Sequence, residues 1–273
     1  MKKCLLFIGL VSSLFTAQSQ DFVVTQLGVR TDSTKPNTQA TQHIIDKAPQ
    51  SGGVLLARPT ASPDKQLNIL TLGDSNGTFP DSWPQQLKLA LPHAQVFNIS
   101  KSGRTIGFVN NGDSTLNSLL VIDENLRKAA EYTQDRPFDF VLLELGTNDA
   151  KAVFADRQKE IPDNLEKLIQ KIKGSNYPAI NQAKIIIISP PPYGTKAEAT
   201  EKYAGGNKRV EKMSKAFKKV ARRNSCLFVN GFKTPGLNME TMANDGLHLN
   251  AIASKRLIAP VIAAITQVKV KDK

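Results

Sequence analysis

The chain has very little cysteine and histidine. Its 273 residues include only Cys4, Cys226 and three histidines. A fold held together by several disulfides is therefore excluded. The sequence also contains no closely spaced cysteine pair and no His-x-x-x-His pattern, so nothing in it indicates a zinc site. Glycine-rich phosphate loops and the Gly-x-Gly-x-x-Gly pattern are also absent. We expect a protein without a metal or a nucleotide cofactor.

No apolar run in the N-terminal region is long enough to span a bilayer. The run from Cys4 to Phe15 is too short, since a membrane helix needs about 20 apolar residues. Lys2 and Lys3 precede it and small residues follow at Ala17, which is typical of a secretory signal peptide. We expect residues 1–19 to be removed on export, which predicts a secreted or periplasmic protein without stable membrane insertion.

Acidic residues are fewer than basic ones, with 24 Asp and Glu against 36 Lys and Arg and a formal charge of +12. Such an excess attracts polyanions, and acidic polysaccharide is one candidate. Much of it lies in residues 208–223, where apolar residues recur at helical spacing. This pattern predicts an amphipathic helix with a solvated basic face, and we expect no nucleic-acid partner.

From Leu67 onward, short apolar runs alternate with helical patterns, which predicts an α/β fold with a parallel sheet between two helical layers. The helical pattern is clearest at Ile161 to Ile172 and Ile258 to Ile265. We expect a three-layer α/β/α sandwich over residues 66–273, with five strands at Leu67–Leu72, Val96–Asn98, Phe138–Leu143, Ile185–Ile188 and Leu227–Val229.

Polar clusters follow the first three predicted strands, and one more precedes the last helix. In chain order they are Gly73-Asp74-Ser75-Asn76, Gly103, Gly146-Thr147-Asn148-Asp149 and Asp245-Gly246-Leu247-His248. Loops at the carboxyl ends of parallel strands meet at one edge of the sheet, where ligands bind. We therefore expect these clusters to form one site.

The clusters contain the residue types of a nucleophilic hydrolase. Ser75 needs a base to take its proton as it attacks, and His248 can act as that base because an unperturbed imidazole titrates at about pH 6.5. Asp245 would orient the imidazole and stabilise its charged form. Each piece alone is also common turn or capping chemistry, so the prediction depends on their joint occurrence in order.

The four clusters resemble the conserved blocks of the SGNH hydrolases, also called the GDSL esterase/lipase superfamily, from about Leu67 to the C-terminus. The resemblance implies a flavodoxin-like fold and an oxyanion hole formed by the backbone N–H groups of Ser75 and Gly103 and the side chain of Asn148. We expect Asp74 and Asp149 to hold loops.

Two positions depart from the family pattern. Asn76 stands where the family often has leucine, and we expect the triad not to depend on it. Glu144 stands where an apolar strand end is usual, and we expect it to be exposed at the rim.

Residues 20–65 precede the blocks as an N-terminal appendage and linker. The part from Phe22 to Pro59 resembles the opening of polygalacturonase-type β-helix enzymes. A small strand-helix-strand appendage and an unrelated leader segment are both open interpretations.

These observations predict a secreted serine esterase that removes short acyl groups, most simply O-acetyl, from a glycan. The long loop from Ser189 through Gly206 has few large apolar residues, which disfavours a lid for long acyl chains. A lysophospholipase or thioesterase of the same fold and a non-catalytic glycan-binding module remain alternatives.

Overall fold

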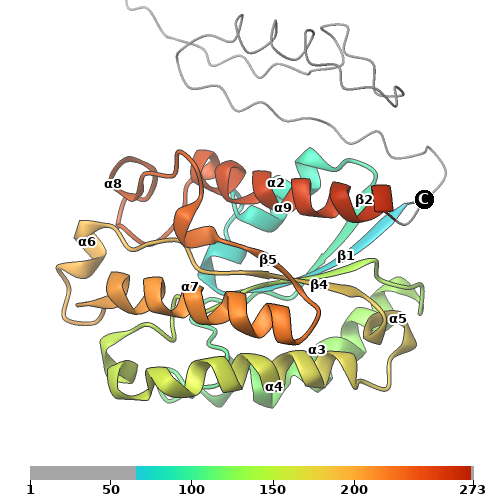
Figure 1. Ribbon diagram of the computed structural model, residues 1–273, viewed down its shortest axis with the longest axis horizontal. Helices are drawn as coiled ribbons and strands as arrows, with labels where there is room; N and C mark the ends of the chain where they lie inside the picture. Colours follow the sequence, from blue (N-terminus) through green and yellow to red (C-terminus); the bar gives the residue numbers. More distant parts are fainter. Residues whose placement is uncertain (1–65, 272–273) are drawn as a thin grey trace, which may run out of the picture. The chain divides into compact units, whose positions relative to one another are not determined.

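The computed structural model describes residues 66–271. The predicted signal peptide over 1–19 and the appendage and linker over 20–65 lie outside the described residues. Strands and helices alternate along the described part (Figure 1). The strands are β1 (Leu67–Gly73), β2 (Ala94–Asn98), β3 (Phe140–Glu144), β4 (Lys184–Ile188) and β5 (Leu227–Val229). The longer helices are α2 (Trp83–Ala90), α3 (Ser118–Thr133), α4 (Ile161–Lys173), α7 (Gly206–Arg223) and α9 (Ala251–Lys271).

Short helical turns fill the connections. They are α5 (Pro178–Asn181), α6 (Thr195–Glu198), α8 (Met239–Met242) and the 3-10 turns η2 (Ser75–Gly77), η3 (Ser114–Leu116), η4 (Ala152–Glu160) and η5 (Gly231–Lys233). Most of them lie at the end of the sheet where the strands finish.

The sheet confirms the predicted fold class. Its strands run parallel in the order β2-β1-β3-β4-β5, which is the flavodoxin-like order. All the predicted strands are present with shifted ends, because β2 begins at Ala94 and β3 at Phe140. Phe138 is not part of β3, because its backbone N–H donates to the carbonyl of Ala179 instead (2.7 Å).

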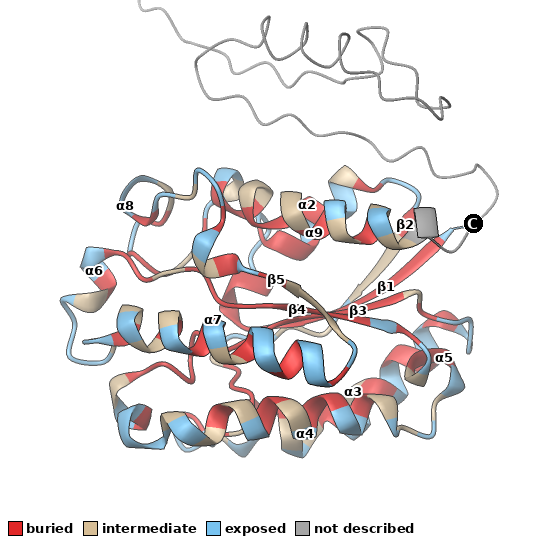
Figure 2. Ribbon diagram, viewed as in Figure 1, coloured by how far each residue is buried: buried red, intermediate tan, exposed pale blue. Residues whose placement is uncertain are grey.

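Helices cover both faces of the sheet, so the architecture is the expected three-layer sandwich. α2 and α9 pack together on one face, while α3, α4 and α7 form the layer on the other (Figure 1). β1 and β3 are buried along their whole length, as expected for central parallel strands covered on both sides. Figure 2 shows this buried centre in red, with exposed residues on the outer sides of the helices.

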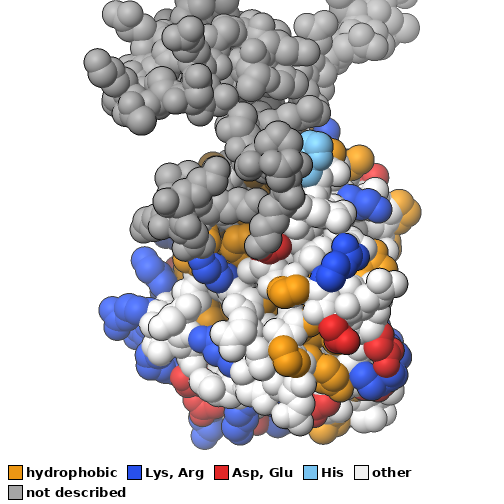
Figure 3. All heavy atoms as spheres, turned by 90° about the vertical axis from the view of Figure 1, so that its right-hand side faces the viewer, with side chains coloured by type: hydrophobic (Ala, Val, Ile, Leu, Met, Phe, Trp, Pro, Cys, Tyr) orange, Lys and Arg blue, Asp and Glu red, His pale blue; other side chains and the backbone are white. Residues whose placement is uncertain are grey.

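α7 is the amphipathic helix that the sequence predicts. Val210, Met213 and Phe217 are buried, while basic residues such as Lys212 and Lys218 are exposed. On the face where β1 begins, seen in Figure 3, Lys and Arg side chains are interspersed with Asp and Glu. The visible charge there is mixed and does not form one continuous basic patch.

α9 is long and apolar enough to cross a membrane by length and composition, over Ala251–Val268. Several of its apolar side chains pack within the domain, however, while Ile252 is exposed. Leu257, Val261 and Ile265 are almost fully buried, and the helix packs against α2 and β5. In this structure α9 is a core helix.

Candidate active site

Ser75 lies directly beyond the carboxyl end of the central strand β1. It is the first residue of the turn η2, and the side chain of Asp74 caps that turn by accepting the backbone N–H of Asn76 (3.0 Å). The serine is 7% exposed. The strand and the cap together fix the backbone that presents its hydroxyl group at the rim of the sheet.

Asp245 and His248 come from one turn between α8 and α9. Asp245 Oδ1 accepts the backbone N–H groups of Leu247 (2.9 Å) and His248 (2.8 Å), so the carboxylate shapes the turn that carries the histidine. Its other oxygen lies 2.5 Å from His248 Nδ1. His248 Nε2 in turn lies 2.9 Å from Ser75 Oγ. The structure thus brings the three residues together in one hydrogen-bonded chain.

The electrostatics of this chain favour an ionised carboxylate. Burial raises the pKa of Asp245, but hydrogen bonds from the backbone and ring of His248 and from the backbone of Leu247 outweigh it and hold the pKa below its usual value. The Asp245 side chain is 53% exposed and that of His248 is 34% exposed. The negative charge of Asp245 beside Nδ1 stabilises the protonated imidazole that forms when Nε2 accepts a proton.

Two neighbours of His248 were missed by sequence reasoning. The amide of Asn76 donates to the carbonyl of Leu247 (3.4 Å) and accepts the N–H of Leu249 (2.9 Å). The Phe79 ring meets the His248 ring edge to face at 5.2 Å. The expectation that the triad does not depend on Asn76 overlooked these bonds, and no local pattern in the sequence could have revealed them.

A second segment also holds the turn with His248. The backbone N–H of Gly194, in the loop after β4, donates to the carbonyl of Gly246 (2.7 Å). In the same loop the Tyr193 hydroxyl donates to the carbonyl of Thr147 (2.5 Å). The loop after β4 therefore braces both the turn with His248 and the loop after β3.

The three predicted oxyanion donors lie in the loops after β1, β2 and β3. Among the described residues, the backbone N–H groups of Ser75 and Gly103 have no hydrogen-bond acceptor. Asn148 Nδ2 donates one N–H to the carbonyl of Arg104 (3.1 Å), which leaves its second N–H for a ligand. Gly103 has φ +82°, a backbone conformation that favours glycine. Asn110 Nδ2 donates a hydrogen bond to the Gly103 carbonyl oxygen (2.6 Å).

Asp74 and Asp149 hold loops, as predicted. Both carboxylate oxygens of Asp149 accept the N–H of Ile106 (3.0 and 3.1 Å), which ties the loop after β3 to the loop after β2. Burial raises the pKa of Asp149 to about 7. Burial also raises the pKa of Asp74, against the hydrogen bond from Asn76.

The prediction for Glu144 is wrong. Glu144 is fully buried at the end of β3, where it pairs in register with Gly73 on β1. Neither its carboxyl oxygens nor Trp83 Nε1 forms a hydrogen bond of normal geometry among the described residues, although Trp83 lies close enough to oppose the rise in the pKa of Glu144. Burial, followed by the charge of Asp74, raises the pKa of Glu144 well above its usual value. The side chain is buried because β3 is a central strand and helices cover both faces of the sheet.

Among residues 66–271, no group of three or more His, Cys, Asp or Glu side chains is placed to hold a metal ion. The chemistry available at the rim is that of a hydroxyl, an imidazole, a carboxylate and amide donors. A hydrogen-bonded Asp-His-Ser chain is the arrangement that serine-dependent hydrolases use on several unrelated folds, and here it lies at the carboxyl edge of the sheet, where ligands bind.

The sequence identifies the family within that class. Residues 62–256 match the GDSL-like Lipase/Acylhydrolase family, and the chain belongs to it. The protein is therefore a carboxylic ester hydrolase of the SGNH type. No curated protein matches the sequence.

Solved structures share the fold at low sequence identity. A carbohydrate acetylesterase from Sinorhizobium meliloti is 22% identical with a TM-score of 0.60, over 73% of this chain and 100% of that chain. An inhibitor-bound aryl esterase from M. Smegmatis is 20% identical with a TM-score of 0.61, over 74% and 99%. A putative arylesterase from Agrobacterium tumefaciens is 22% identical with a TM-score of 0.59, over 74% and 98%.

Proposed function

We propose that this protein is an exported esterase that uses Ser75 as nucleophile to remove short acyl groups, O-acetyl above all, from a carbohydrate. The observation that carries the proposal is the hydrogen-bonded chain from Asp245 through His248 to Ser75. His248 Nε2 takes the proton as Ser75 Oγ attacks the ester carbonyl, and then gives it to the departing alcohol. Water, activated by the same imidazole, releases the acid from the acyl-enzyme.

The oxyanion hole belongs to the same proposal. Negative charge develops on the former carbonyl oxygen, and each preorganised donor at such a site is worth about 3–4 kcal/mol. The backbone N–H groups of Ser75 and Gly103 and the second N–H of Asn148 fit this role because they have no other acceptor among the described residues.

The composition of the chain, the loop after β4 and one structural relative support the carbohydrate part of the proposal. It draws on the low aromatic content of 6% and on the scarcity of large apolar residues in the loop after β4. The basic excess of the chain also makes an acidic polysaccharide a candidate carrier. One relative of the same fold is named a carbohydrate acetylesterase.

The acyl preference is tested with 4-nitrophenyl esters of increasing chain length. We expect kcat/KM to be highest for acetate and to fall with longer chains. An optimum at long chains would favour a lysophospholipase or thioesterase. Release of acetate from a panel of acetylated polysaccharides then identifies the carrier.

The nucleophile is tested by Ser75→Ala, with the exposed Ser114→Ala as the matched control. We expect Ser75→Ala to lose turnover of 4-nitrophenyl acetate by a factor of at least about 10³ and to keep carbohydrate binding, while Ser114→Ala retains full activity. Equal turnover by Ser75→Ala and the parent would rule out this role for the serine.

Export rests on the N-terminal pattern alone. Expression of the full-length chain in a bacterium, followed by N-terminal sequencing of the protein found outside the cytoplasm, tests it. We expect a new N-terminus near residue 20. An intact Met1 on cytoplasmic protein would contradict export.

A further inference from the structure

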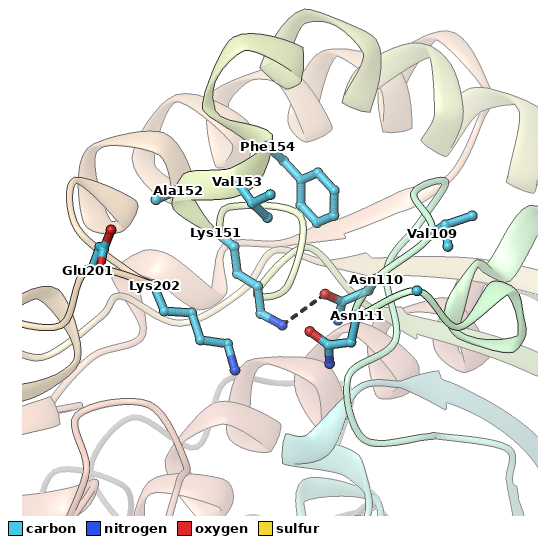
Figure 4. Close-up of a pocket in the computed structure, with 10 residues that line it drawn as sticks. Val109, Asn110, Asn111, Lys151, Ala152, Val153, Phe154, Glu201 and Lys202 are labelled. Atoms are coloured by element: carbon cyan, nitrogen blue, oxygen red, sulfur yellow. Dashed lines mark hydrogen bonds between the residues drawn. The ribbon is translucent and has the colours of Figure 1, made fainter.

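A cavity of about 780 Å3 adjoins the loop that carries Gly103. It is lined by residues 109–112 after β2, residues 151–154 after β3 and residues 201–202 before α7 (Figure 4). Asn110, in its wall, donates to the carbonyl of Gly103 (2.6 Å). The cavity is therefore connected by one hydrogen bond to the backbone of the proposed oxyanion hole.

Two ammonium groups point into this cavity. Lys151 is 2% exposed, and its Nζ donates to Asn110 Oδ1 (3.1 Å). Lys202 is exposed, and its Nζ lies 5.3 Å from the centre of the Tyr203 ring. Figure 4 shows both lysine side chains converging on the same space, with the side-chain amide of Asn111 facing them.

Within residues 66–271, no carboxylate forms an ion pair with either of these two lysines. The one carboxylate in the lining, Glu201, lies at the far edge of the cavity in Figure 4. Burial, followed by the charge of Lys202, lowers the pKa of Lys151 to about 8, while Asp74 and Asp149 act in the opposite direction. Lys151 thus remains mostly protonated at neutral pH.

We propose that this cavity binds a carboxylate of the ester substrate, held by Lys151 and Lys202 with the amide of Asn111. Two like charges that face one space repel each other, and a buried ammonium group lacks its hydration. An anion between them relieves both costs. The proposal rests on the proposed function, because it adds a subsite to the same enzyme.

The carboxylate has two possible sources, and matched substrate pairs distinguish them. The first pair is the methyl glycoside of an O-acetylated hexuronic acid with its carboxylate free, and the methyl glycoside of the corresponding hexose with the same acetyl position. The second pair is 4-nitrophenyl hemiglutarate and 4-nitrophenyl valerate. The measured quantity is the ratio of kcat/KM between the anionic and the neutral member of each pair, at low ionic strength.

We expect the kcat/KM of the wild-type enzyme to be at least about tenfold higher for the anionic member of one pair. A hydrogen bond to a charged group changes a binding constant by about that factor or more. A preference in the first pair assigns the carboxylate to a uronic acid, and one in the second assigns it to the acyl chain. Lys202→Met and Lys151→Met should each reduce the ratio about tenfold, mainly through KM. The exposed Lys218→Met on α7 is the control and should retain it.

Lys202→Met keeps the test decisive if the buried Lys151→Met does not fold. A ratio near one for the wild type in both pairs, or an unchanged ratio in Lys202→Met, would overturn the subsite. Failure of the proposed function is a different result: in that case the wild type and Ser75→Ala would hydrolyse the neutral esters equally slowly.

Discussion

Asn76 connects the residue after the proposed nucleophile to the turn of the proposed base. Its buried amide bonds the backbone on both sides of His248, at Leu247 and Leu249. This makes Asn76 a positioning residue: its side chain fixes where the imidazole lies relative to Ser75. A side chain without both a donor and an acceptor cannot replace it.

We expect Asn76→Leu, the residue usual in the family, to lower kcat by a factor of about 10–100 with little change in KM. The physical reason is that a buried N–H and a buried carbonyl lose their partners, at about 1–3 kcal/mol each. Steady-state kinetics on 4-nitrophenyl acetate and urea unfolding measure the two effects. An unchanged kcat in a folded variant would contradict the positioning role.

Glu144 provides a second prediction for a single residue. Because its folded pKa is raised, the carboxyl stays protonated in the folded protein while it ionises in the unfolded chain. The contribution of this group to the free energy of unfolding is therefore fully present below the unfolded pKa of about 4.3. It is lost as pH rises towards the folded pKa, at up to about 1.4 kcal/mol per pH unit.

Glu144→Gln removes this titration. We expect the variant to gain stability relative to the parent between pH 5 and pH 8, measured as the free energy of unfolding in urea at several pH values. Asp156→Asn, which changes an exposed carboxylate on η4, is the control and should follow the parent. Parallel curves for Glu144→Gln and the parent would show that the buried carboxyl does not titrate as described.

The residue types of the site could be read from the sequence, but their supporting partners could not. Ser75, Asp245 and His248 stand in recognisable local patterns, and the structure brings them together. The hydrogen-bond partners of Asn76 and Lys151 come from segments far away in the chain. No spacing pattern in the sequence therefore predicts the roles of these two residues. Glu144 was misplaced because a charged side chain at a strand end normally reaches water, and here the neighbouring strands and helices enclose it.

Among the elements, the loops after β2 and β3 form one unit through Asp149. Its carboxylate accepts the N–H of Ile106 with both oxygens, and Asn148 beside it bonds the carbonyl of Arg104. These bonds set the position of Gly103 relative to Asn148. The two proposed oxyanion donors are thus held by contacts between loops.

We expect Asp149→Ala to lower kcat by a factor of about 10–100 and to destabilise the fold by about 1–3 kcal/mol, since the buried N–H of Ile106 loses its acceptor. Asp149→Asn retains one acceptor oxygen and should have a smaller effect on both. Ester kinetics and urea unfolding of the two variants measure this order. Equal losses in both variants would show that the carboxylate charge matters more than the hydrogen bond.

The sequence predicts long elements better than short ones. The strands and α4, α7 and α9 follow from apolar runs and helical periodicity. The four-residue helices α5, α6 and α8 are too short to show any period. Tertiary contacts hold them instead: Glu240 at the start of α8 accepts the N–H (2.8 Å) and hydroxyl (2.6 Å) of Thr195 at the start of α6.

At the scale of the whole molecule, we expect the excess of basic residues to speed the binding of negatively charged polymers and to leave the chemical steps at Ser75 unchanged. Raising ionic strength from about 0.01 M to about 0.1 M shortens the Debye length from about 30 Å to about 10 Å. We expect the kcat/KM for an acetylated acidic polysaccharide to fall several-fold over this range, and that for 4-nitrophenyl acetate to stay constant. Acetate release and 4-nitrophenol release measure the two rates. Equal sensitivity of both substrates would contradict a role for long-range charge.

Asp245 and His248 of the proposed triad share one turn, which Asn76 holds at Leu247 and Leu249 and Gly194 holds at Gly246. A shift of residues 245–248 would carry the imidazole and its carboxylate away from the hydroxyl group as a single body. His248 would keep its hydrogen bond to Asp245 and lose only its contact with Ser75 Oγ. Activity could then be switched off by disengaging one short piece of backbone, while the sheet beneath it stays intact.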